Sequence, residues 1–139
     1  MDFELRRATA NDERAVVSLW ETCGLVAAHN PPNVDFQRAL NAPSADIIVA
    51  HLESALVGSA MVGDDGHRGW IYYLAVAPEF QRTGLGRELC AACETWAGER
   101  GLCKIQLMIR PSNESVASFY AAAGYEETPR LVMAKWLDT

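Results

Sequence analysis

The chain has 139 residues and a formal net charge of −6; half of its residues are apolar and 22% are charged. This length fits one domain with its own core, and the chain is too apolar to be a disordered segment. No apolar run approaches the ~18 residues that a membrane span needs. The acidic balance argues against nucleic acid or an anionic membrane as the main partner, and no export leader is recognisable, so we predict one cytoplasmic domain over residues 1–139.

Apolar periodicity predicts a strand and two helices in the first part of the chain. Charged and apolar residues alternate over residues 2–6, which is typical of a half-buried strand. Thr9 is placed to cap a helix, with Asp12 three positions on as in a capping box. A break rich in proline and asparagine at residues 29–33 then separates this helix from a short one around residues 36–40.

The middle of the chain is predicted to be all strand. A hairpin joins residues 46–52 to residues 56–62, and a polar, glycine-rich loop follows. Residues 70–76 are rich in aromatic and branched side chains and form the segment most prone to be a strand. Pro78, which has no N–H to donate, ends this strand.

The last part of the chain alternates helices and strands. We predict helices at residues 85–97 and 116–123, and strands at residues 104–109, 124–127 and 131–137. This order indicates an α/β (α+β) fold with a mixed central sheet of about six to seven strands flanked by helices. Its first half would be antiparallel, and a parallel β-α-β crossover would follow residues 70–76.

The four cysteines, Cys23, Cys90, Cys93 and Cys103, are predicted to have no role in chemistry. Cys90 and Cys93 have the spacing of a metal or redox pair, but a zinc site needs a second pair and the sequence has none. Two small side chains packed on one helix face explain the spacing, so no metal is expected.

The segment between the aromatic strand and the longest helix carries the chemistry. Its residues are Gln81, Arg82, Thr83, Gly84, Leu85, Gly86 and Arg87. The first N–H groups of a helix have no partner within the helix, and a phosphate placed there satisfies several of them. The two glycines let the backbone approach an anion, and the two arginines add positive charge. By itself this pattern equally fits a tight strand-to-helix turn, and it matches neither a P-loop nor a complete dinucleotide fingerprint.

With its neighbours, the segment resembles the pyrophosphate-binding motif of the GNAT superfamily of acyl-CoA-dependent N-acetyltransferases. The motif is Gln81-x-x-Gly84-x-Gly86, which follows residues 74–78 and opens a long helix. Asn113 and the pair Phe119-Tyr120, before Gly124, resemble the family's second cofactor-binding segment. The loop at residues 65–69 resembles that of the YpeA-type subgroup of bacterial acetyltransferases.

The resemblance implies a role for each matching residue. Backbone N–H groups of residues 82–87 would bind the CoA pyrophosphate, and Asn113 would hold the pantetheine arm. Leu74, Ala75 and Val76 would pair with the pantetheine amides as an added strand does, and an N–H near Ala75 or Val76 would polarise the acetyl carbonyl. Tyr120 would protonate the departing thiolate; from the helix pattern alone, a core aromatic position is the favoured reading.

The general base has no predicted position. Several members of the family carry a carboxylate on the strand before the motif, and residues 70–76 contain none. An alkylammonium with a pKa of ~10 is only ~0.1% neutral at pH 7, so a path for its proton is needed. The candidates are Asp64, Asp65, His67, Glu79, or a water held by Tyr72 or Tyr73.

These observations predict an N-acetyltransferase that moves an acetyl group from acetyl-CoA to a primary amine by direct attack. The acceptor, a small molecule or a peptide or protein amine, is not identified, and neither is the acyl preference beyond acetyl or the choice between monomer and homodimer. The alternative is a CoA-binding sensor or interaction module without turnover, which the missing strand carboxylate motivates.

Overall fold

The computed structural model describes residues 1–138. Contacts divide the chain into two compact units, Met1–Leu107 and a smaller one that starts at Met108. The first unit contains the strands β1 Glu4–Arg7, β2 Ala45–Leu52, β3 Ala55–Asp64, β4 Gly69–Val76 and β5 Ile105–Gln106. Its helices are η1 Ala10–Asp12, α1 Glu13–Thr22, α2 Pro32–Asn41, η2 Pro78–Phe80 and α3 Leu85–Glu99, and the second unit contains α4 Glu114–Ala122.

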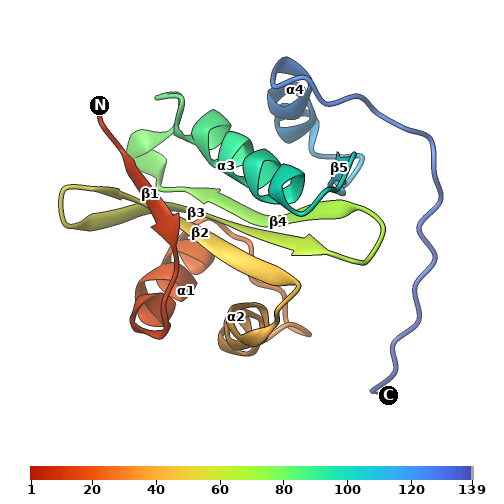
Figure 1. The fold of residues 1–139 in the computed structure, drawn as a ribbon, viewed down its shortest axis with the longest axis horizontal. Coiled ribbons are helices and arrows are strands. Elements are labelled where there is room, and N and C mark those ends of the chain that lie inside the picture. The colour runs from red at the N-terminus through yellow and green to blue at the C-terminus, as the bar shows by residue number, and fades with distance from the viewer. Residues whose placement is uncertain (139) are drawn as a thin grey trace. The chain divides into compact units, whose positions relative to one another are not determined.

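The five strands form one mixed sheet in the order β1-β2-β3-β4-β5 (Figure 1). The first three neighbouring pairs are antiparallel, and β4 pairs with β5 in parallel. The α3 helix makes the crossover between the two parallel strands. The predicted fold class is therefore confirmed, including its antiparallel first half and its parallel β-α-β crossover.

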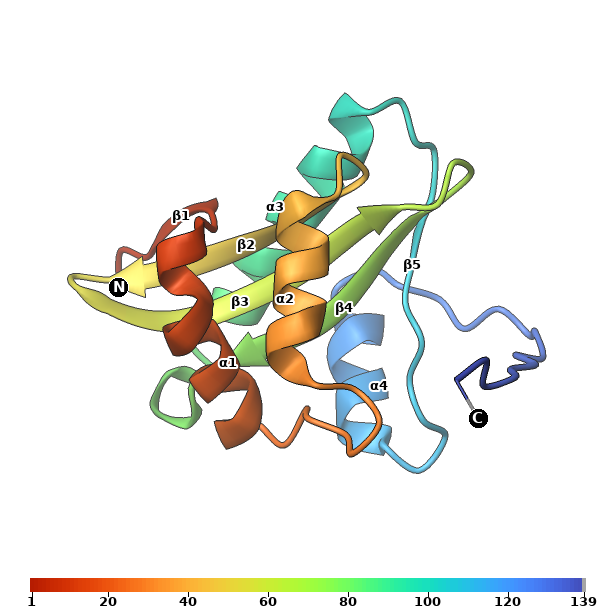
Figure 2. The same cartoon turned by 90° about the horizontal axis from the view of Figure 1, so that it is seen from below.

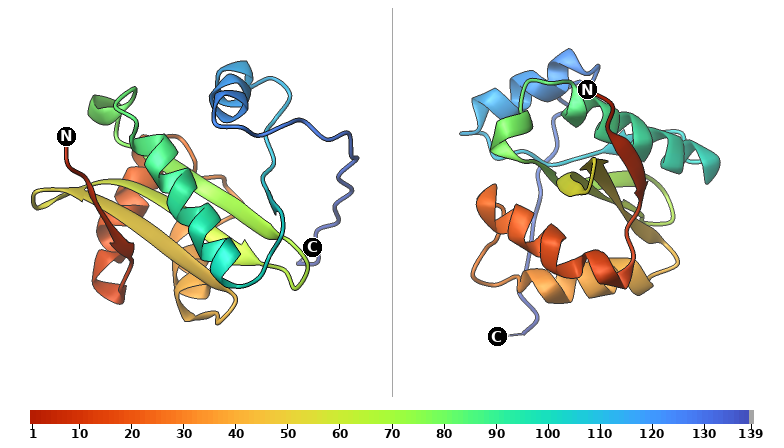
Figure 3. Two further views of the ribbon diagram at one scale, coloured as in Figure 1. Left: turned by 45° about the horizontal axis from the view of Figure 1, so that its top comes forward. Right: turned by 90° about the vertical axis from the view of Figure 1, so that its left-hand side faces the viewer.

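Helices cover both faces of this sheet. The α1 and α2 helices pack on one face and α3 packs on the other (Figures 1 and 2). The view along the sheet in the right half of Figure 3 shows these three layers. Trp20 and Phe36 fill the layer under α1 and α2, and Leu85, Leu89 and Cys93 fill the layer under α3, all fully buried. This burial explains the apolar stripes of these helices.

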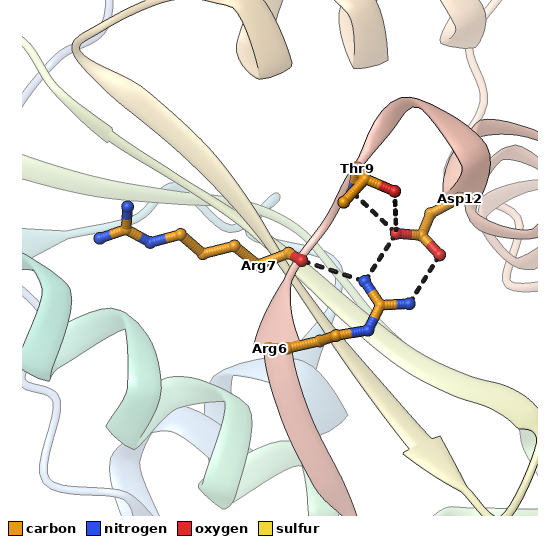
Figure 4. A network of polar contacts seen from close by, with 4 residues as sticks. All are labelled: Arg6, Arg7, Thr9 and Asp12. Atoms are coloured by element: carbon orange, nitrogen blue, oxygen red, sulfur yellow. Dashed lines mark hydrogen bonds and ion pairs between the residues drawn. The ribbon is translucent and has the colours of Figure 1, made fainter.

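A polar network joins β1 to the start of α1 (Figure 4). The Asp12 carboxylate accepts a hydrogen bond from the Thr9 backbone N–H at 2.8 Å, as the capping-box pattern predicts. The Arg6 guanidinium donates to both oxygens of the same carboxylate, at 2.8 and 2.9 Å. These contacts hold the pKa of Asp12 at about 2, with the Arg6 hydrogen bonds as the largest cause.

The second helix begins earlier than predicted. Pro32 and Asn33, placed in the break at residues 29–33, form the first turn of α2. Proline suits this position because the first helical N–H has no partner within the helix and the ring presets φ.

The number of strands is smaller than the six to seven predicted. No strand forms at residues 124–127 or 131–137 within the part of the chain that the structure describes, and β5 keeps only two residues of the strand predicted at 104–109. A strand needs a neighbouring edge for its N–H and C=O groups, and an alternating pattern does not supply one. In the tail, Leu131 and Met133 are more than 90% exposed and Pro129 lacks a donor.

Among residues 1–138, no helix is both long enough and apolar enough to cross a bilayer.

Candidate active site

The loop between β4 and α3 has the backbone conformation that its glycine pattern predicts. Gly84 immediately precedes α3 in the left-handed region, at a φ of 89°. Arg82 also has a positive φ, of 63°. The Thr83 hydroxyl donates to the carbonyl of Phe80 and fixes the loop against η2. Alternating left-handed residues of this kind turn successive N–H groups toward a common side, which is the geometry of an anion-binding nest.

The backbone amides of this loop lack partners. In the described chain, no hydrogen bond reaches the N–H groups of residues 82–86, and the first bond of α3 runs from the Glu88 N–H to the Gly84 carbonyl at 3.1 Å. A Cβ added to Gly84 would meet no atom within 4 Å. The donors are therefore uncapped beside open space, at the positive end of a helix dipole. This geometry can receive a phosphate, and binding of the CoA pyrophosphate by these residues stays a prediction.

Close packing on the sheet sets the position of this loop. Leu85, the first residue of α3, is fully buried. A Cβ added to Gly58 of β3 would lie only 3.0 Å from the Leu85 Cδ2 atom and 3.1 Å from the Leu89 Cδ1 atom. Glycine at position 58 thus lets the first turn of α3 rest directly on β3.

The adjoining strand is irregular where the cofactor is predicted to lie. Ser59 pairs with Ala75 but Met61 pairs with Tyr72, so β4 has one extra residue in a bulge. Tyr73 lies in this bulge with a φ of 51°. On its other edge, β4 pairs with β5 only at Gly69 and Trp70. The rest of that edge, including Leu74, Ala75 and Val76, has no strand partner in the described sheet, as an added strand would require.

Gln81 and Cys23 both contact the end of β4. The Gln81 side-chain amide and the Cys23 thiol each donate to the Val76 carbonyl at 3.4 Å. Gln81 thus ties the loop to the strand. Cys23 reaches this strand because α1 ends beside it. Burial raises the pKa of its thiol, so the weakly nucleophilic protonated form is favoured.

Two other predicted residues belong to the second unit. Asn113 caps α4, and its side-chain oxygen accepts from the Val116 N–H at 3.4 Å. Tyr120 is buried in the same helix. Its ring meets those of Phe119 and Tyr125 edge-on, at centroid separations of 5.0 and 5.5 Å. The roles of Asn113 and Tyr120 toward a cofactor stay predictions.

The acidic loop before β4 is a structural turn. Asp65 accepts from the backbone N–H groups of Arg68 and His67 and from the Trp70 indole, at 2.6, 2.8 and 2.9 Å. These bonds lower its pKa to about 2, the Arg68 N–H being the largest cause. The Asp64 carboxylate accepts from the Gly66 N–H at 2.7 Å. Carboxylates engaged in this way are poor candidates for the missing base.

Sequence reasoning missed a polar cluster on the face of β4 that α1 and α2 cover. The Tyr73 hydroxyl donates to the Asp35 carboxylate of α2 at 2.6 Å. The Tyr73 ring stacks on Trp20 of α1, with centroids 4.0 Å apart, and the Trp20 indole donates to Ser59 at 3.1 Å. Asp35 is 38 positions from Tyr73 in the sequence, and no local signal links the two.

Comparisons with known proteins identify the family. The profile of the acetyltransferase (GNAT) family matches residues 13–125. An acetyltransferase of Pectobacterium atrosepticum is 38% identical over 135 residues, which cover 97% of this chain and 96% of that protein. One of Yersinia enterocolitica is 37% identical over the same shares of the two chains.

Solved structures share the fold. The aminoglycoside N-acetyltransferase AAC(6′)-Iy, bound to a bisubstrate analogue of CoA and acetylneamine, matches with a TM-score of 0.85 at 19% identity, over 98% of this chain and 99% of that one. An aminoglycoside acetyltransferase from an uncultured soil sample, bound to sisomicin, matches with a TM-score of 0.80 at 20% identity, over 99% and 97% of the two chains.

Proposed function

This chain belongs to the acetyltransferase (GNAT) family, and from that premise we propose that it transfers the acetyl group of acetyl-CoA to a primary amine by direct attack. The amine nitrogen adds to the thioester carbonyl, and the C–S bond then breaks to release CoA. This route needs a neutral amine, a polarised carbonyl and a proton for the leaving sulfur, and it needs no covalent enzyme intermediate.

The observation that carries the proposal is the row of unpartnered amides at residues 82–86. A pyrophosphate accepts hydrogen bonds from several N–H groups at once, and each charge-assisted bond is worth about 1.5–3 kcal/mol. The exposed Arg82 adds positive charge next to this row. In a chain of net charge −6, such a local concentration of donors favours a specific anion site over a general attraction to anions.

The unpaired edge of β4 supplies a second element of the site. Pantetheine has two amides, and an extended chain with amides can pair with an open strand edge. Leu74, Ala75 and Val76 follow the last β4 residue paired with β5. The bulge interrupts the pairing of β4 with β3 just before Ala75. We place the N–H that polarises the acetyl carbonyl near Ala75 or Val76.

We assign the remaining roles to residues of the second unit. Asn113 would hold the pantetheine arm and Tyr120 would protonate the CoA thiolate. A phenol with a pKa of ~10 and a thiol with a pKa of ~8.5 are close enough for this transfer. The acceptor is inferred to be a small-molecule amine, since several structural neighbours are aminoglycoside acetyltransferases.

Release of free thiol from acetyl-CoA, followed across a panel of amines, tests the proposal. We expect thiol release that depends on the amine, together with an acetylated product of matching mass. Gly84→Trp should abolish CoA binding because the indole would fill the open space over the amides. Gly98→Ala, near the other end of α3 and also facing open space, is the control. Tight CoA binding without turnover of any amine would favour a sensor instead.

A further inference from the structure

The contact between Asp35 and Tyr73 joins α2 to the bulge of β4, the strand along which we propose that pantetheine lies. The Tyr73 hydroxyl donates to the Asp35 carboxylate at 2.6 Å, a length typical of a strong, charge-assisted bond. Both residues are half-buried, so neither is sealed inside the core. Asp35 lies in the first turn of α2, and Tyr73 lies on the sheet face that α1 and α2 cover.

Tyr73 has an unfavourable backbone conformation that its surroundings maintain. A φ of 51° is rare for a bulky residue, and such conformations cost about 1–3 kcal/mol. The Tyr73 ring stacks on Trp20 with planes 13° apart, and Trp20 is fixed by its bond to the buried Ser59. Residues held in this way gather at functional sites, where the fixed geometry serves the chemistry. Here it fixes the phenolic oxygen.

The position of Tyr73 along β4 suits a group that handles the acceptor amine. Tyr73 lies two positions before Ala75, near the N–H proposed to polarise the acetyl carbonyl. Even a fully extended chain would separate the two residues by at most about 7 Å. The turn that contains Asp65 lies before Gly69, the first residue of β4, which is six positions from Ala75, or about 20 Å at the usual rise per strand residue. Tyr73 and its partner are therefore far better placed than the acidic turn.

We propose that Tyr73, held by Asp35, receives the proton that the acceptor ammonium must lose before it attacks acetyl-CoA. Tyr73 would be a catalytic residue, because its oxygen contacts the amine; Asp35 would be a positioning residue that acts through Tyr73. The inference rests on the proposed N-acetyltransferase function and names its substrate class: amines that arrive as cations, attracted by the Asp35 carboxylate.

The proton transfers balance over one turnover. The ammonium gives one proton to the Tyr73 oxygen while the Tyr73 proton passes to the Asp35 carboxylate. The neutral amine then forms the new C–N bond, and the C–S bond breaks with its electron pair going to sulfur. The thiolate takes up one proton from its donor, and the proton that the amide nitrogen loses restores that donor. Asp35 then releases its proton to solvent, which returns Asp35 and Tyr73 to their starting states. The net products are the acetamide, free CoA and one proton released to solvent.

The charges around Tyr73 are consistent with this role. Burial and the neighbouring Asp35 carboxylate raise the pKa of Tyr73, so the phenol keeps its proton at neutral pH and can relay it. Asp35 is the charged group that acts on Tyr73. Tyr72 precedes it on β4 and Cys23 follows the end of α1, while Glu21 and Arg38, on the two covering helices, have exposed side chains. Burial is the largest cause of the raised pKa of both Tyr72 and Cys23.

The test compares Tyr73→Phe and Asp35→Asn with the wild-type enzyme. Both variants should lower kcat/KM for a cationic amine by ~10²-fold and leave the affinity for CoA, measured by calorimetry, unchanged. The pH profile separates catalysis from structure. The wild-type kcat/KM should vary little between pH 7 and 9, whereas in Tyr73→Phe it should rise ~10-fold per pH unit with the neutral fraction of the amine.

Glu13→Gln is the matched control, because it changes a carboxylate of α1 that contacts α2 without contacting Tyr73. Glu13 accepts from Gln37 at 3.0 Å, and the variant should keep both wild-type activity and the wild-type pH profile. If Asp35→Asn does not fold, Tyr73→Phe still tests the proposed proton transfer, since it keeps the ring stacked on Trp20. Wild-type turnover with an unchanged rate and profile in Tyr73→Phe would overturn this inference alone. A wild-type enzyme that acetylates no amine would overturn both this inference and the proposed function.

Discussion

Removing the carboxylate of Asp12 should destabilise the fold by an amount that depends on pH. The Asp12 side chain is 11% exposed and accepts hydrogen bonds from Arg6 and from the Thr9 N–H (Figure 4). Its pKa is lowered from 3.8 to about 2. At about 1.4 kcal/mol per pKa unit, this shift corresponds to roughly 2 kcal/mol of folding free energy. The Arg6 side chain is 47% exposed and partly screened by water, so we expect about 1–2 kcal/mol.

The sign of the pH dependence follows from the lowered pKa. Above about pH 4 the carboxylate is charged in both states, and its full contribution to stability is present. As the pH falls from about 4 to about 2, the unfolded chain takes up the proton first, and the contribution is lost. Urea unfolding of wild type and Asp12→Asn from pH 7 to pH 2 should therefore give a difference in unfolding free energy that is largest at pH 7 and shrinks toward pH 2.

The control for this experiment is Asp2→Asn, at an exposed position before β1. It should change the free energy of unfolding by no more than about 0.5 kcal/mol at any pH. A difference between wild type and Asp12→Asn that stays constant from pH 7 to pH 2 would refute the reasoning, because it would not come from the ionised carboxylate.

Three further predictions concern the cofactor. Gly84→Val should weaken CoA binding in calorimetry by ~10²-fold or more, because it should remove one or two amide hydrogen bonds worth about 3 kcal/mol, while Gly98→Ala should bind as wild type does. Gly58→Ala should lower the free energy of unfolding by about 1–3 kcal/mol in urea, because its Cβ would press on Leu85, and should also weaken CoA binding. Tyr120→Phe should lower kcat by ~10²-fold with little change in CoA affinity, and equal rates would return Tyr120 to a purely structural role.

Local chemistry made part of this protein predictable. The left-handed backbone at Gly84 and the uncapped amides after it follow from residues adjacent in the chain, and so does the bond between Thr9 and Asp12. The family resemblance rested on the same loop, and the match over residues 13–125 confirms it.

Features that depend on distant partners could not be predicted. The bulge at Tyr73 exists only because β3 and β4 pair with a shifted register, and the contact with Asp35 depends on where α2 packs. The strand expected at residues 131–137 does not form, for the same reason. Alternating apolar and polar residues indicate the two faces of a strand, but the strand also needs the edge of another strand to pair with. Arg6 as a partner of Asp12 likewise depends on the path of β1.

The central claim is that the backbone amides of residues 82–86 receive the CoA pyrophosphate. The most direct measurement follows the amide signals of ¹⁵N-labelled protein by NMR during titration with CoA, and with pantetheine, which lacks the pyrophosphate. We predict large shifts of the signals of residues 82–86 with CoA, and none of comparable size there with pantetheine. Saturation with CoA that leaves these signals in place, or equal shifts with pantetheine, would contradict the account.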